Sequence, residues 1–92
     1  MKYVDVLTAS EYNEVLMTDW KQFIERDPDV MLGKPVFTGT RITVEFVLER
    51  LAQGATPQEL VDNYEGLKPE HIPAALAYAA SAVSRDELVT LA

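Results

Sequence analysis

The sequence has no cysteine, one histidine and few basic residues. Without cysteine the chain forms no disulfide and offers no thiolate ligand, and a single histidine cannot hold zinc alone, so we expect no metal and no cofactor. Eight lysines and arginines stand against fifteen acidic residues, for a net charge of −7. This balance argues against a protein that binds nucleic acids or membrane surfaces in general. It is compatible with an acidic antidote that binds a basic partner protein.

Long apolar runs are also missing. No stretch approaches the roughly 20 apolar residues that span a bilayer, so we expect no membrane association. The start, "MKYVDVLTASEY", contains an aspartate and no hydrophobic secretory region, which predicts a cytoplasmic protein. The 92 residues make about one small domain, whose modest core would gain from burying a further face, so we expect a homodimer.

Gly33-Lys34 invites comparison with a phosphate-binding loop, but the spacing fails. Such a loop has a glycine five residues before the Gly-Lys pair and a serine or threonine after it, where this chain has Pro28 and Pro35. No serine, threonine or carboxylate has a partner with which to assemble a reaction. We therefore predict no catalytic residues, no small-molecule substrate and no enzymatic activity.

Two other reactive-looking positions have simple structural explanations. His71 falls at the start of a predicted helix, where we expect a lone surface histidine. Asp27 and Asp29 flank Pro28 and could be imagined as a magnesium pair. An Asp-Pro-Asp turn in which the carboxylates cap backbone N–H groups is the stronger interpretation.

The N-terminal part predicts a helix and a short β element. Thr8 and Glu11 have the spacing of a capping box, which predicts a helix over about Ala9–Met17. The spacing leaves open whether this helix continues through Trp20 to Ile24. Farther on, β-prone residues lie on either side of residues 38–40, at Val36-Phe37 and Arg41-Ile42, and predict a small hairpin or β-bend.

Three amphipathic helices are predicted after this bend. The first begins after Thr43 and ends before Gly54, the second begins at Pro57 and ends before Gly66, and the third begins at Pro69. Their apolar stripes would close a three-helix core with the layout of a helix-turn-helix. We predict a mainly α fold with an N-terminal helical extension over residues 1–19, a core over 20–84 and a tail over 85–92.

The stretch from "DPDVMLGKPVFTGTRITVEF" to "PEHIPAALAYA" resembles the domain-of-unknown-function 433 family over about Trp20–Ala80. The motif residues that carry the resemblance are Asp27, Pro28, Gly33, Lys34, Pro35, Gly39, Thr40, Arg41 and Gly54. The resemblance implies a homeodomain-like three-helix fold with a small β element in front. It also implies an antitoxin role in which the partner is a PIN-like nuclease toxin.

A DNA-binding role needs side chains that can read bases, and the last helix has few. Between Pro69 and Val83 it offers His71, Tyr78 and Ser81 as polar candidates and no lysine or arginine. The candidates for DNA or partner contact are therefore Lys34, Arg41, Arg50, Lys68 and His71. Three hypotheses stay open: an antitoxin-like module that also binds DNA as a dimer, a stand-alone DNA-binding regulator, and a dimeric interaction domain of other purpose.

Two groups of residues have both a structural and a functional interpretation. Arg41 could contact a phosphate or a partner, but we favour a structural role in which it binds Asp27, Asp29 or backbone carbonyls and fixes the bend. The apolar side chains of Trp20, Phe23 and Ile24 are expected to cover the core or a dimer interface. They could instead form a partner-binding strip.

Overall fold

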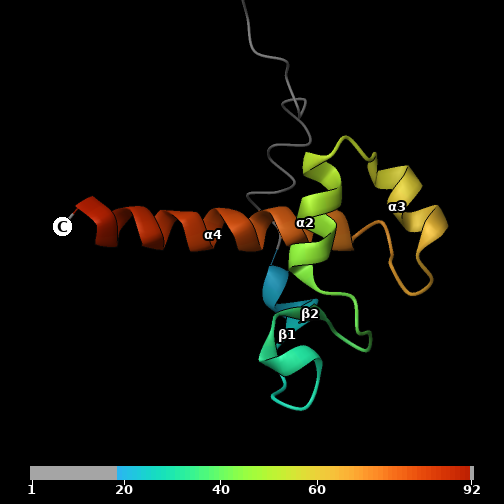
Figure 1. The fold of residues 1–92 in the computed structure, drawn as a ribbon, viewed down its shortest axis with the longest axis horizontal. Helices are drawn as coiled ribbons and strands as arrows, with labels where there is room; N and C mark the ends of the chain where they lie inside the picture. The colour runs from blue at the N-terminus through green and yellow to red at the C-terminus, as the bar shows by residue number, and fades with distance from the viewer. Residues whose placement is uncertain (1–18, 92) are drawn as a thin grey trace, which may run out of the picture.

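A computed structural model of the chain describes residues 19–91, with the backbone alone for residues 85–91. A 3-10 turn at Trp20–Gln22 precedes strand β1 (Ile24–Glu25), and a short turn at Met31–Gly33 precedes strand β2 (Val36–Phe37). Three helices follow: α2 (Val44–Ala52), α3 (Pro57–Asn63) and α4 (His71–Leu91) (Figure 1). The fold class is as predicted: mainly α, with a short antiparallel sheet before three helices. The predicted helix over Ala9–Met17 lies outside the described residues.

The two strands pair antiparallel, with Ile24 opposite Phe37 and Glu25 opposite Val36. Ile24 is buried and Glu25 is exposed, which is the alternation of a half-buried strand. The predicted bend after Phe37 also forms, because Val36 makes a single bridge to Thr43. The main partner of β2 is nevertheless β1, and not the residues just after the bend.

Trp20, Phe23 and Ile24 have helical spacing but do not lie in one helix. The N–H of Phe23 donates to the carbonyl of Trp20 (2.9 Å) and closes one 3-10 turn, which the Asp19 carboxylate caps by accepting from the N–H of Lys21 (3.3 Å). The chain then becomes extended at Ile24. All three side chains join the hydrophobic core or pack against it, in agreement with the predicted core-covering role.

Helix α2 begins and ends where the sequence predicts, and α3 begins at Pro57 as predicted but ends at Asn63, because Tyr64 is already extended. The hydroxyl of Thr43 accepts from the N–H of Phe46 (3.0 Å), and Gly54 follows α2 with φ +101°, a conformation that favours glycine. Thr56 and Glu59 form a reciprocal capping box at the start of α3.

Helix α4 begins two residues later than predicted. The N–H of His71 donates to the carbonyl of Lys68 (2.9 Å), and the N–H of Lys68 donates to Nδ1 of the His71 ring (3.0 Å). These two bonds hold a turn over Lys68–Glu70, so Pro69 precedes the helix. Pro73 falls in the first turn of α4, where its missing N–H costs no helical hydrogen bond.

Helix α2 packs against both α3 and α4, and the core lies where these elements meet β1 and β2. The buried apolar side chains are those of Ile24, Val36, Phe37, Val44, Val47, Leu60, Leu67, Ile72, Ala74 and Ala75. Helix α4 continues well past this core and runs unbroken to Leu91, whereas we predicted a tail over 85–92 (Figure 1). Among residues 19–91, no helix is long and apolar enough to cross a membrane.

Candidate partner-binding surface

The loop between β1 and β2 is held by hydrogen bonds of its own chain. The Asp27 carboxylate accepts from the N–H of Asp29 (2.9 Å), as predicted for an Asp-Pro-Asp turn. The N–H of Val30 donates to the carbonyl of Asp27 (2.8 Å), and the N–H of Gly33 donates to that of Val30 (3.0 Å). Within the described part of the chain, no three histidine or acidic side chains gather as metal ligands.

Met31 and Leu32, at the end of this loop, carry left-handed backbone. Their φ angles are +49° and +59°, and Gly33 follows at +80°. This conformation costs a residue with a side chain about 1–2 kcal/mol. The Leu32 side chain is nevertheless 93% exposed and that of Met31 is 45% exposed. We call these two residues the tip. Strained backbone that presents apolar side chains to solvent points to a functional surface.

An apolar depression lies between α2 and α4. It has a volume of about 340 Å³ and is lined by Pro35, Val44, Glu45, Leu48, Glu49, Ala52 and Tyr78. The aliphatic side chains and the Tyr78 ring make its surface almost wholly apolar, and Glu45 and Glu49 are exposed at its rim. We call this depression the groove. Neither the tip nor the groove was predicted from the sequence. The one available signal for the tip was a pair of large apolar residues directly before a turn glycine.

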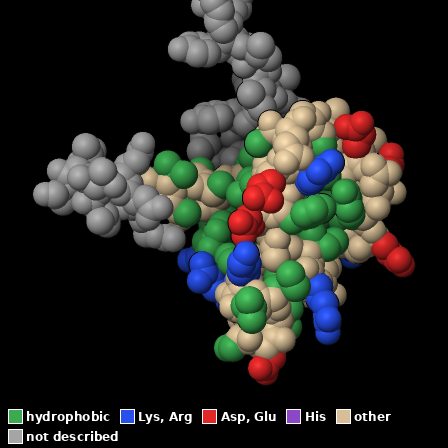
Figure 2. All heavy atoms as spheres, in the orientation of Figure 1, with side chains coloured by type: hydrophobic (Ala, Val, Ile, Leu, Met, Phe, Trp, Pro, Cys, Tyr) green, Lys and Arg blue, Asp and Glu red, His purple; other side chains and the backbone are tan. Residues whose placement is uncertain are grey.

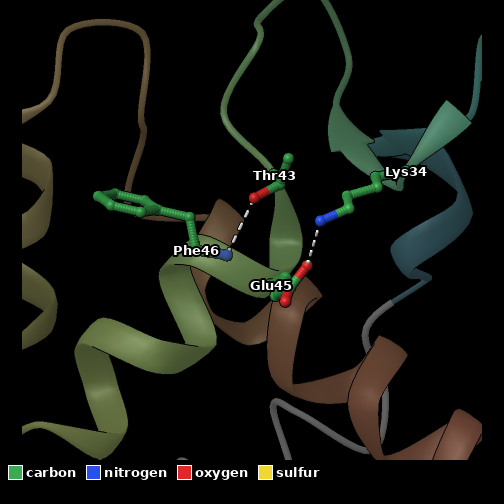
Figure 3. Close-up of polar contacts among 4 residues, drawn as sticks. All are labelled: Lys34, Thr43, Glu45 and Phe46. Carbon is green, nitrogen blue, oxygen red and sulfur yellow. Dashed lines mark hydrogen bonds and ion pairs between the residues drawn. The ribbon is translucent and has the colours of Figure 1, made fainter. Parts of the chain in front are cut away.

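Lys34 connects the tip and the groove. Its ammonium lies 3.0 Å from the carboxylate of Glu45, with both side chains about half exposed (Figure 3). Such an exposed pair contributes less than about 1 kcal/mol to folding. Figure 2 looks onto this face, where hydrophobic side chains at the loop end lie close to acidic and basic side chains beside α2.

The predicted structural role of Arg41 is wrong. Arg41 is exposed and makes no hydrogen bond or ion pair with residues 19–84. Thr40 holds the bend instead, because its hydroxyl donates to the carbonyl of Phe37 (2.8 Å) and accepts from the N–H of Ile42 (3.0 Å). A short hydroxyl next to the backbone satisfies these groups without a long, entropically costly side chain. Arg41 therefore stays a candidate for contact with a partner.

The prediction of a surface position for His71 is also wrong. Its side chain is 6% exposed, its ring is stacked on that of Phe37 with 4.7 Å between the centroids, and the Phe23 ring packs against it edge to face with 6.2 Å between the centroids. Burial is the main cause that lowers the pKa of His71 below its usual 6.5. His71 is a neutral core residue that also accepts the N–H of Lys68, and it cannot touch DNA or a partner from there.

The remaining basic candidates do not form one patch. Lys34 lies at the first turn of α2, whereas Arg50 lies in the last turn and donates from Nη1 to Gln53 (2.9 Å). Arg50 is half buried, and its Nε has no partner among the described residues. Lys68 is exposed in the turn before α4. The three cations thus lie near the start of α2, in its last turn and in the connection between α3 and α4.

Tyr78 was predicted to be an exposed polar residue of the last helix, but it is half buried. Its hydroxyl accepts from Nη2 of Arg26 (2.7 Å), and the edge of its ring meets the Trp20 ring at 4.8 Å. Tyr78 thus ties the N-terminal turn to α4 and forms one wall of the groove.

The chain is similar to known proteins in both sequence and structure. The profile of a family described as protein of unknown function (DUF433) matches residues 24–79, more than half of the chain. The chain belongs to the DUF433 family. It is similar to the crystal structure of a DUF433 member protein from Anabaena variabilis ATCC 29413, with 28% sequence identity and a TM-score of 0.63. That similarity covers 92% of this chain and 87% of the other. No curated protein matches the chain.

The DUF433 match contains the tip and every residue that lines the groove. Its motif residues shape backbone in this structure: Asp27 accepts an N–H in its turn, Thr40 holds the bend, and Gly54 follows α2. The second half of α4 lies beyond the matched range. The motif residues of the family therefore shape the loop and the bend. Their roles in the structure do not indicate a chemical reaction.

Proposed function

We propose that this DUF433 protein is a non-enzymatic, antitoxin-like module that binds a PIN-like nuclease toxin in the cytoplasm. Membership of the family supports the proposal, since that role is what the resemblance of the sequence implies. The observation that carries it is the second half of α4, which offers a long helical surface outside the core.

Helix α4 continues for 13 residues after Tyr78, from 79 to 91. At about 1.5 Å per residue this half extends about 20 Å. In Figure 1 it reaches past α2, and no other described element lies beside it. Val83 on this half is 54% exposed, and Ala80 is exposed as well. A helix of this length is stabilised in water mainly by packing, so the exposed positions Ala80 and Val83 suit contact with the groove of a partner protein.

Charge favours a basic partner. The chain carries a net charge of −7, and Asp62, Glu65 and Glu70 on α3 and the turn before α4 are all exposed. A nuclease binds the phosphates of its substrate with a basic surface. An acidic protein can compete for that surface and accelerate its own association through long-range attraction.

DNA binding is the alternative, and the structure gives it less support. The first turns of α4 would have to enter a groove of DNA, but His71 is buried there and Tyr78 is engaged with Arg26 and Trp20. The basic candidates are spread along α2 and the adjoining turns. A gel shift with the upstream DNA of the gene, in competitor DNA at about physiological salt, tests this alternative.

The proposal is tested by co-expressing the full chain with the nuclease-like protein encoded next to it. We expect the two proteins to co-purify, and we expect Val83→Glu to weaken their affinity by at least tenfold. The matched control is Thr38→Glu, which adds the same charge at an exposed position of the bend. No complex with the wild-type chain, or equal affinity of both variants, would overturn the proposed role of α4.

A further inference from the structure

The tip and the groove are complementary and lie on one face of the chain. We propose that two copies of the chain pair through this face, with the tip of each copy seated in the groove of the other. The proposal does not depend on a nuclease partner, because the projecting half of α4 is not used in it.

The tip is built to project. The bonds from the N–H of Gly33 to the carbonyl of Val30 (3.0 Å) and from the N–H of Lys34 to that of Met31 (3.1 Å) fix the backbone around it. The backbone that carries Leu32 is therefore fixed before any contact is made, and its side chain is almost fully exposed. A backbone that is already ordered loses little freedom on association, so the cost of placing this apolar side chain in an interface is reduced.

The groove matches the tip in chemistry. Its lining includes the apolar residues Pro35, Val44, Leu48 and Ala52, and among the described residues no side chain fills it. An apolar side chain entering it would be removed from water together with the exposed part of this lining, which is the main favourable term in association. The depression is concave where the tip is convex.

The position of the two features suits a two-fold axis. Lys34 directly follows the tip, Pro35 lines the groove, and Lys34 binds Glu45 on the groove rim (Figure 3). An axis that passes midway between tip and groove exchanges them, so each tip meets a groove. It also brings Lys34 of one copy opposite Glu45 of the other. The centre of the interface then alternates in charge and contains no like-charged pair.

A second copy is the occupant that these observations favour. The same face supplies both the projection and the depression, which is the self-complementarity of an isologous interface. A chain of 92 residues has a small core and gains from a further buried face. Other occupants of the groove become outcomes of the test.

Because the chain has no cysteine, single cysteines can be introduced as disulfide probes without competing thiols. One batch of full-length chain carries Leu32→Cys and a second carries Ala52→Cys, on the tip and the groove respectively, and the two are mixed and mildly oxidised. We expect a mixed disulfide dimer at a yield at least tenfold above that of Leu32→Cys mixed with Gln58→Cys. Gln58 is exposed on α3, away from the groove lining.

Sedimentation of the wild-type chain gives an independent measure. We expect a dimer at tens of micromolar protein and at least a tenfold weaker association for Leu32→Asp, with an unchanged circular-dichroism spectrum because Leu32 is exposed. A wild-type chain that stays monomeric at 200 μM would overturn the proposal. A dimer that shows no preference for the Leu32–Ala52 cross-link, or that Leu32→Asp leaves intact, would overturn the proposed interface.

Discussion

Replacing Leu32 with glycine is predicted to stabilise the folded chain, although it removes a large apolar side chain. Leu32 sits at φ +59°, where a residue with a side chain is strained by about 1–2 kcal/mol. Glycine adopts this conformation without strain but loses about 0.5–1 kcal/mol through the greater freedom of the unfolded chain. The side chain is 93% exposed, so its loss removes little buried area.

The difference lies between about 0 and 1.5 kcal/mol, with a central gain of about 0.75 kcal/mol in the free energy of unfolding. For a domain of this size that central gain would raise the melting temperature by about 3–6 °C. The assay is thermal unfolding followed by circular dichroism, at a protein concentration low enough to keep the chain monomeric. Ala80→Gly is the matched control, because Ala80 is exposed in regular helix and should lose about 1 kcal/mol.

A lower melting temperature for Leu32→Gly than for the wild type would refute this reasoning. It would mean that the Leu32 side chain packs against the monomer, or that its backbone is not left-handed. The same variant is expected to weaken self-association at high protein concentration. For Leu32→Gly we therefore expect a more stable monomer and a weaker dimer. A variant that simply folds less well would lose both monomer stability and dimer affinity.

Other predictions concern the core and the bend. Leu60→Ala removes a fully buried side chain and should cost about 2–5 kcal/mol in urea unfolding. The pKa of His71 is lowered in the folded state, so the stability that the neutral ring contributes is complete above the unfolded pKa of 6.5 and is lost as the pH falls below it. Urea unfolding at pH 7.5 and pH 5 measures this loss. The free energy of unfolding of His71→Phe should depend less on pH than that of the wild type. Thr40→Val should lower the free energy of unfolding by about 1 kcal/mol, whereas Arg41→Ala should leave it within about 0.5 kcal/mol of the wild type. A larger loss for Arg41→Ala than for Thr40→Val would restore the structural role of Arg41.

Local signals predicted much of the fold. Thr43 and Thr56 cap α2 and α3 as their spacing requires, and Gly54 ends α2, because caps depend on residues only a few positions apart. Strand β1 was not predicted, since two residues are too short to show alternation. Its pairing with β2 is a contact between distant segments that no local pattern records.

The candidate site was harder to predict for the same reason. His71 has the sequence context of a surface residue at a helix start, but the rings of Phe37 and Phe23 come from the strand and the N-terminal turn. The groove needs Pro35, α2 and Tyr78 together, and only the packing of α2 on α4 brings them close. The left-handed backbone of the tip is imposed by the turns around it. The residue types there, methionine and leucine, would not predict this conformation.

The most direct test of the proposed function is the activity of the neighbouring nuclease-like protein on RNA as this chain is added. We expect cleavage to fall as the chain is added and to stop near one equivalent, and we expect the Val83→Glu variant to require at least ten times more protein for the same inhibition. Undiminished cleavage at saturating concentrations of the wild-type chain would contradict the account.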